Sequence, residues 1–517
     1  MLGLFGGRGK PDHPLADAKE ARRILSTVGS LEPHKALSEL DEWIDSVSGA
    51  EGFKPEDRAN LILQLDEAGQ PHARKILRDY LNSARMPKQQ ESKLWSAYYE
   101  FLSRLADAYV KCIDLSIDGV RGSDALKPLL PVLGVRATRA LGGQLKLLQM
   151  RYRPVHGDLW FAVGRIYRHL RSRKLHLKSV FVYPSGAQES CVEHEFIKVM
   201  MFAASSPDSL VPVEIEIAER VIAHFVQDFS LTTTPQPDTT YWIDLDEADP
   251  PLRLAQPPEL SDTLVFFSAG SALRGVEDLS KLIANKGMVP SDVALEGIYK
   301  PEQVVEVLDH LSMYWAKSPP IRRHERHRVK NRLSVVHGYA GLVACLSWDG
   351  STTDLAISEE NTVESWVVQN VSAGGFGATT PQLTGDWLRI GCVLGMQPDG
   401  GANWLVGLVR RLARDADDQG NVGIQTVAKS AFPVELRTGG SGASIGTGIL
   451  LVDPTDKAGE VRILLDVDRF DDRRSIEMVK DGINHLLMPV GIIEQGDDYE
   501  LARYRDMRRI QTVDLEM

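Results

Sequence analysis

The sequence predicts a multidomain α+β protein in which a helical N-terminal region precedes a strand-rich C-terminal region. The chain has 517 residues, which exceeds the size of one typical domain. Apolar residues recur every three or four positions through much of residues 14–229, as in amphipathic helices. After residue 333, short runs of β-branched and aromatic residues alternate with turn residues, as in antiparallel strands.

The helical prediction is clearest in residues 89–115. Their apolar side chains step by three and four positions and would bury one helix face against another helix. These side chains are Leu94, Tyr98, Phe101, Leu102, Leu105, Tyr109 and Cys112. Similar patterns predict helices over residues 16–28, 37–44, 137–150, 161–170, 192–204 and 213–229. No fixed repeat period is present, so we expect stacked antiparallel helices without assigning a named repeat.

The polar segment 232–238 interrupts the helical pattern and predicts a linker or a long loop. Strands are predicted over residues 241–245, 252–254 and 263–267, and helices over 276–285 and 301–315. Residues 231–317 therefore form either a small α/β domain or a connecting region that packs against the strand-rich region.

Residues 322–332 form a basic run that comes after Pro319 and Pro320, which cannot continue the preceding helix. We expect the run to lie in a loop. Strand-like runs are present at 333–336, 340–348 and 365–368, and residues 370–377 then predict a tight glycine turn. Arginine forks match phosphate oxygens and the O6/N7 edge of guanine, and glycine permits close backbone approach.

This stretch resembles the PilZ domain, the bacterial receptor module for cyclic di-GMP. Arg322 and Arg326 match its R-x-x-x-R segment, and Asn370, Ser372 and Gly375 match its [DN]-x-S-x-x-G segment. Further strand-like runs at 388–394, 404–409 and 422–425 extend the resemblance over residues 318–437. The resemblance implies a small antiparallel β-barrel.

The resemblance also implies a cyclic di-GMP site in this barrel. Its implied residues are Arg322, Arg323, Arg326, Arg328, Asn370, Ser372 and Gly375. Arg328 with Arg332 fits the arginine spacing equally well, so the sequence leaves the arginine register open.

Residues 439–448 contain many glycines but lack the G-K-[ST] ending of a phosphate loop, so we expect a flexible interdomain loop there. Strand-like runs at 449–452, 461–467 and 486–493 predict a small β unit. The sequence leaves open whether this unit is a second barrel. The predicted domains are residues 1–230, 231–317, 318–437 and 438–517.

Composition narrows the function. The net charge of −12 argues against nucleic acid as a partner, and the absence of a long apolar run argues against stable membrane insertion. The cysteines at 112, 191, 345 and 392 are scattered, which predicts reduced thiols, no metal site and a cytoplasmic protein. Asp158 follows His156-Gly157 as in a phosphotransferase loop, but no later metal-binding aspartate accompanies it. We expect a helix start there and no enzyme.

Together with the resemblance to PilZ domains, these features predict a cytoplasmic, non-catalytic cyclic di-GMP receptor that needs no cofactor. Its helical region would meet an unidentified output protein. The alternative is an interaction scaffold with a degenerate barrel that does not bind nucleotide.

Overall fold

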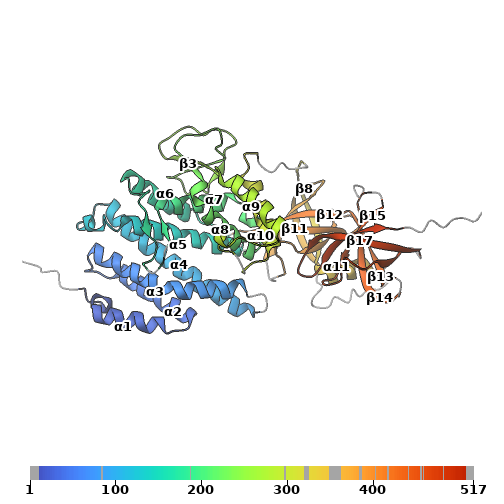
Figure 1. Cartoon of the computed structure of the whole chain (residues 1–517), viewed down its shortest axis with the longest axis horizontal. Helices are drawn as coiled ribbons and strands as arrows, with labels where there is room; N and C mark the ends of the chain where they lie inside the picture. The colour runs from blue at the N-terminus through green and yellow to red at the C-terminus, as the bar shows by residue number, and fades with distance from the viewer. Residues whose placement is uncertain are drawn as a thin grey trace, which may run out of the picture. The chain divides into compact units, whose positions relative to one another are not determined.

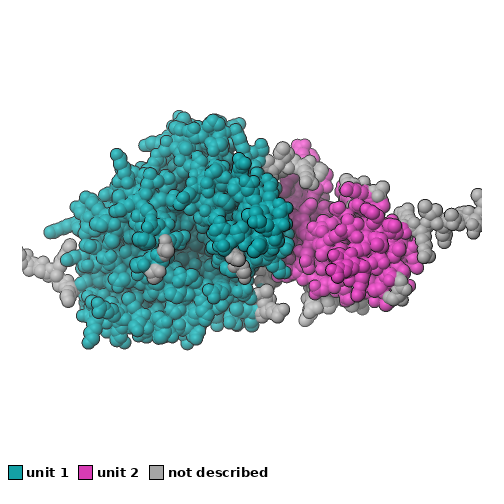
Figure 2. All heavy atoms as spheres, in the orientation of Figure 1, with its two compact units in different colours: residues 1–151, 155–320 teal, residues 152–154, 321–517 magenta. Residues whose placement is uncertain are grey.

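The fold is that of a computed structural model that divides into two compact units, residues 1–151 with 155–320 and residues 152–154 with 321–517 (Figure 2). We call them the helical unit and the barrel unit. The structure describes residues 11–82, 86–184, 186, 188–295, 298–318, 325–347, 363–382, 387–401, 403–415, 419–439, 442–453, 457, 459–480 and 483–507.

In the described residues, the helical unit begins with eight α-helices (Figure 1). They are α1 (Ala18–Gly29), α2 (Pro33–Gly49), α3 (Pro55–Leu81), α4 (Lys88–Ile117), α5 (Leu130–Met150), α6 (Gly157–Ser172), α7 (Val192–Ala204) and α8 (Pro212–His224). Asp17 caps α1 by accepting hydrogen bonds from two backbone N–H groups. Proline starts α2, α3 and α8, where its fixed φ suits the first helical turn.

These helices pack as the apolar stripes predict. Helices α2, α3 and α4 pack pairwise, and α4 also packs along α5. Phe101, Leu105, Tyr109 and Cys112 of α4 are almost completely buried, and Trp95, on the same helix, is buried as well. The predicted helical N-terminal region is therefore confirmed. Asp158 lies in the first turn of α6, as expected from the sequence.

A small sheet with two helices completes the helical unit. The strands β3 (Ser230–Thr232), β4 (Tyr241–Asp244), β5 (Leu252–Arg253) and β6 (Leu264–Ser268) are ordered β3-β6-β4-β5. Helices α9 (Ala272–Lys286) and α10 (Pro301–Trp315) come after it, and a separate two-stranded pair joins β1 (Val180–Phe181) and β2 (Glu189–Ser190). Trp315 and Tyr241 belong to the same hydrophobic core as the helices, so this α/β part is continuous with the helical array.

A buried ion cluster on α7 makes the stability of the helical unit depend on pH. Glu195 is 2% exposed and lies 2.6 Å from Lys198 and 3.3 Å from Arg139, and it accepts a hydrogen bond from Ser190. Burial alone would raise the pKa of Glu195, but the two cations together lower it to about 2. The unfolded chain therefore takes up this proton first as pH falls.

We expect the contribution of Glu195 to be complete above about pH 4.5 and to be lost as pH falls toward 2. The expected size is about 3 kcal/mol of unfolding free energy. Urea unfolding between pH 6 and pH 2.5 should show a shallower loss of stability for Glu195→Gln than for the wild type. Parallel pH curves for the two proteins would contradict this assignment.

The described part of the barrel unit forms two closed six-stranded antiparallel barrels, drawn in yellow to red in Figure 1. The first has the order β10-β11-β12-β9-β8-β7 and consists of β7 (His327–His337), β8 (Glu364–Ser372), β9 (Gly375–Gln382), β10 (Val393–Pro398), β11 (Leu405–Arg414) and β12 (Gln419–Ala428). Its core contains Trp366 and Leu394. The expected barrel is therefore present.

The second barrel has the order β13-β14-β15-β18-β17-β16. Its strands are β13 (Ser430–Thr438), β14 (Ser444–Val452), β15 (Glu460–Leu465), β16 (Ile476–Lys480), β17 (Ile483–Gln495) and β18 (Glu500–Asp506). The C-terminal β unit is thus itself a barrel. Residues 444–448 lie in β14 and residues 439, 442 and 443 connect β13 to it, so the expected interdomain loop is instead a hairpin inside this barrel.

One predicted strand is wrong. The sequence predicts a strand over residues 340–348, but α11 occupies Gly338–Ser347. Tyr339, Leu342 and Leu346 recur on one face of α11 and pack in a shared cluster with Val406 of the first barrel and Ile449 of the second. Burial of this helical face between the two barrels outweighs the β propensity of the apolar run.

None of the helices in the described part of the chain has the length and apolar character needed to cross a membrane.

Candidate functional site

The basic run continues directly into a strand. Residues 327–332 belong to β7, so the expected loop over 319–332 is wrong for this portion of the run. Strand β7 pairs with β8, with Arg328 across from Asn370 and Arg332 across from Val367. Arg326 immediately precedes the strand, and Arg326, Arg328 and Arg332 are all exposed. Arg322 and Arg323 lie outside the described residues.

The other predicted residues gather at the β8–β9 hairpin. Asn370 and Ser372 end β8, Gly375 begins β9, and the turn between them is the one that the sequence predicts. The Ser372 hydroxyl donates to the carbonyl oxygen of Gly375 over 3.4 Å. The carbonyl oxygen of Gly374 accepts a 3.0 Å hydrogen bond from the backbone N–H of Thr426 on β12. One hydrogen bond within the hairpin and one from β12 therefore hold the turn in place.

Gly375 has a structural reason to be glycine. Its φ is +156°, and a Cβ atom there would overlap the carbonyl oxygen of Ile424. The backbone that approaches Gly375 closely is thus that of β12. Because the fold itself requires this glycine, its presence alone does not identify a ligand contact.

Asn370 lies across from Gly377, and a Cβ atom on Gly377 would be 2.6 Å from the Asn370 amide nitrogen. The Asn370 side chain therefore lies over the space that this glycine leaves. The Asn370 Oδ1 atom is buried and has no hydrogen-bond partner among the described residues. A buried amide oxygen without a partner costs about 1–3 kcal/mol, which a ligand N–H group would offset.

The structure brings together Arg328, Asn370, Ser372 and Gly375, all residues singled out from the sequence. Gly377 was missed. Its sequence signal is a second glycine two positions after Gly375, which places both glycines on the same face of β9. The structure does not choose between the pair Arg322 with Arg326 and the pair Arg328 with Arg332. Arg328 lies across from Asn370, as the binding of one ligand by both side chains would require.

Polar contacts join the first barrel to the second. The Arg410 guanidinium donates to both carboxylate oxygens of Glu494 over 2.6 Å, and its Nε donates to Gln425 over 2.7 Å. Gln425 lies across from Gly375. The Tyr499 hydroxyl of the second barrel donates to the carbonyl oxygen of Gly391 in the first. A bidentate pair of this kind fixes orientation as well as adding energy.

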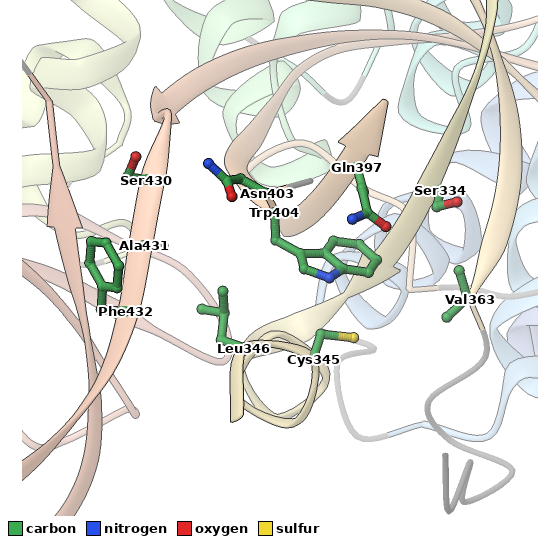
Figure 3. A pocket seen from close by; sticks show the side chains of 10 residues that line it. All are labelled: Ser334, Cys345, Leu346, Val363, Gln397, Asn403, Trp404, Ser430, Ala431 and Phe432. Carbon is green, nitrogen blue, oxygen red and sulfur yellow. The ribbon is translucent and has the colours of Figure 1, made fainter. Parts of the chain in front are cut away.

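A separate cavity of about 470 Å³ lies in the barrel unit (Figure 3). Its lining residues are Ser334, Cys345, Leu346, Val363, Gln397, Asn403, Trp404, Ser430, Ala431 and Phe432. Trp404 appears in the middle of the view, between Gln397 and Cys345. None of the described residues that line this cavity carries a charge, so these residues suit a phosphate ligand less well than the arginine-bearing strand β7 does.

Within the part of the chain that the structure describes, no group of three or more His, Cys, Asp or Glu side chains could hold a metal ion.

The helical region is similar to part of a known protein family. No curated protein matches the chain. Residues 19–237, which include α2 to α8 and β3, match the family model described as "Cyclic-di-GMP receptor FimW, N-terminal domain".

Proposed function

We propose that the chain is a cyclic di-GMP receptor that binds the dinucleotide on the outer face of the first barrel. The family match supports the receptor class, although it covers the helical region and stops before the barrels. The resemblance to PilZ domains supports the place of binding. The observation that carries the proposal is the position of Arg328 directly across from Asn370, whose buried amide oxygen has no partner among the described residues.

The chemistry of these residues fits guanine and phosphate. Arg328 would donate to phosphate oxygens or to guanine O6 and N7, together with Arg322, Arg323 and Arg326. The Asn370 amide oxygen would accept a hydrogen bond from an N–H group of guanine, and Ser372 would donate to the same ligand. Gly375 would keep the hairpin in shape beneath them. The receptor would act without catalysis, and its helical unit would present the surface for an output protein.

Calorimetric titration of the full chain with cyclic di-GMP tests the proposal. Each lost charged hydrogen-bonding group is expected to weaken binding about tenfold to a hundredfold. Arg328→Ala and the double variant Arg322→Ala/Arg326→Ala, measured separately, would show which arginine register holds the ligand. Asn370→Ala tests the amide contact.

Arg473→Ala is the matched control. The Arg473 side chain is 90% exposed on the same unit, and the substitution removes an equal charge elsewhere on that unit. If the folded wild-type protein does not bind cyclic di-GMP, the receptor proposal is wrong. The better account is then an interaction scaffold whose barrel does not bind nucleotide. Equal affinity of wild type and every arginine variant would place the ligand elsewhere on the chain.

A further inference from the structure

A single row of residues crosses the first barrel at right angles to its strands. Strand pairing sets Arg328 across from Asn370, Asn370 across from Gly377, Gly377 across from Gly423, and Gly423 across from Arg411. Directly opposed residues in an antiparallel sheet point to the same face. Arg328 and Arg411 are both exposed, so the row lies on the outer face of the barrel.

Gly377 and Gly423 lie next to each other in this row. Their backbone conformations do not require glycine, because both lie outside the left-handed region. Both positions instead lack room for a side chain. A Cβ atom on Gly377 would meet the Asn370 amide at 2.6 Å, and one on Gly423 would lie 3.1 Å from the Cβ of Arg411. Gly377 therefore makes room for the Asn370 amide and Gly423 for the Arg411 side chain, and neither glycine adds a side chain of its own to the row.

The ends of the row carry the polar side chains that the two glycines lack. An arginine stands at each end, and the buried Asn370 Oδ1 faces this row without a partner among the described residues. Asn370 and Arg411 are separated by three strand spacings, which is about 14 Å along the sheet. This is the separation of the two backbones, and a dinucleotide is long enough to reach both side chains across it.

We propose that Arg411 lines the dinucleotide site at the end opposite Arg328 and Asn370. The inference rests on the proposed function and adds a residue that neither the sequence motif nor the family match includes. Arg328 and Asn370 hold one nucleotide, no side chain of Gly377 or Gly423 stands between Asn370 and Arg411, and the Arg411 guanidinium donates to the second nucleotide. A flat guanidinium fork suits either its phosphate or its guanine edge.

The test compares Arg411→Ala with Arg328→Ala and the control Arg473→Ala in titrations with cyclic di-GMP and with GMP, which supplies one nucleotide. Arg411→Ala is expected to weaken cyclic di-GMP binding about tenfold to a hundredfold while leaving GMP binding unchanged. Arg328→Ala is expected to weaken both. Thermal melting of each variant checks that the barrel remains folded.

The outcomes separate this inference from the proposed function. If the wild type binds cyclic di-GMP and only Arg328→Ala weakens it, the receptor stands and the role of Arg411 is overturned. If Arg411→Ala weakens both ligands equally, Arg411 does not contact a second nucleotide, and the inference also fails. If the wild type does not bind, both proposals fall together.

A second variant covers the case in which Arg411→Ala unfolds the barrel. Arg411→Lys keeps the long stem and the charge but lacks the bidentate fork. It should still reduce the affinity for cyclic di-GMP, and wild-type affinity in this folded variant would overturn the role of the fork.

Discussion

Replacing Arg136 by alanine is expected to lower the unfolding free energy of the helical unit by about 3 to 5 kcal/mol. Arg136 on α5 and Asp66 on α3 are each 2% exposed and lie 3.5 Å apart. The Arg136 guanidinium also donates to Glu67 over 2.8 Å, and to the carbonyl oxygens of Val182 and Leu63. Removing the cation leaves the Asp66 carboxylate and these acceptors buried without their donor.

Burial raises the pKa of Asp66, and the nearby Arg136 charge opposes that shift. Tyr109 donates to the same carboxylate over 2.7 Å. In Arg136→Ala, Asp66 is therefore expected to take up a proton more readily, which limits the loss without removing it. Urea unfolding monitored by circular dichroism would measure the difference at neutral pH.

A paired variant removes both the unpaired buried charge and the cavity. Arg136→Met with Asp66→Asn keeps similar side-chain volumes and an acceptor for Tyr109, but buries no charge. It is expected to be more stable than Arg136→Ala. If the two variants lose the same stability, neither the cavity nor the unpaired carboxylate accounts for the loss, which then arises from the Arg136 hydrogen bonds that both variants lack.

The helical part of the fold could be predicted because its signal is local. The stripe in α4 and the bounds of α7 and α10 follow from apolar spacing and from the prolines and polar residues at the helix ends. The α11 segment could not be assigned in the same way. Its ten residues are nearly all apolar, so a period of two and a period of 3.6 fit them equally well.

The candidate site depends on strand register, which the sequence does not contain. Arg328 and Asn370 are 42 positions apart, and only the pairing of β7 with β8 places them side by side. The same holds for Arg411, which reaches the row through β12 and β9. Glycine motifs mark a position of close approach, but the sequence cannot say whether a ligand or another strand approaches. At Gly375, the approaching group is β12.

Gly375→Ala is expected to destabilise the first barrel by about 2 to 6 kcal/mol. Overpacking against the Ile424 carbonyl accounts for about 1–3 kcal/mol, and a backbone conformation reserved for glycine accounts for about 1–3 kcal/mol. The β8–β9 hairpin would have to move away from β12, and Asn370 and Ser372 would move with it. Loss of ligand binding in this variant would therefore result from loss of the barrel structure.

Gly400→Ala is the matched control for Gly375→Ala. Gly400 has a φ of +76°, and a Cβ atom there would meet nothing within 4 Å, so this variant adds backbone strain without a clash. We expect its melting temperature to fall less than that of Gly375→Ala. Equal losses would show that the close approach of β12 contributes nothing. Unchanged stability of Gly375→Ala would mean that this position is free of the constraint, and its glycine would then have to be explained by the ligand.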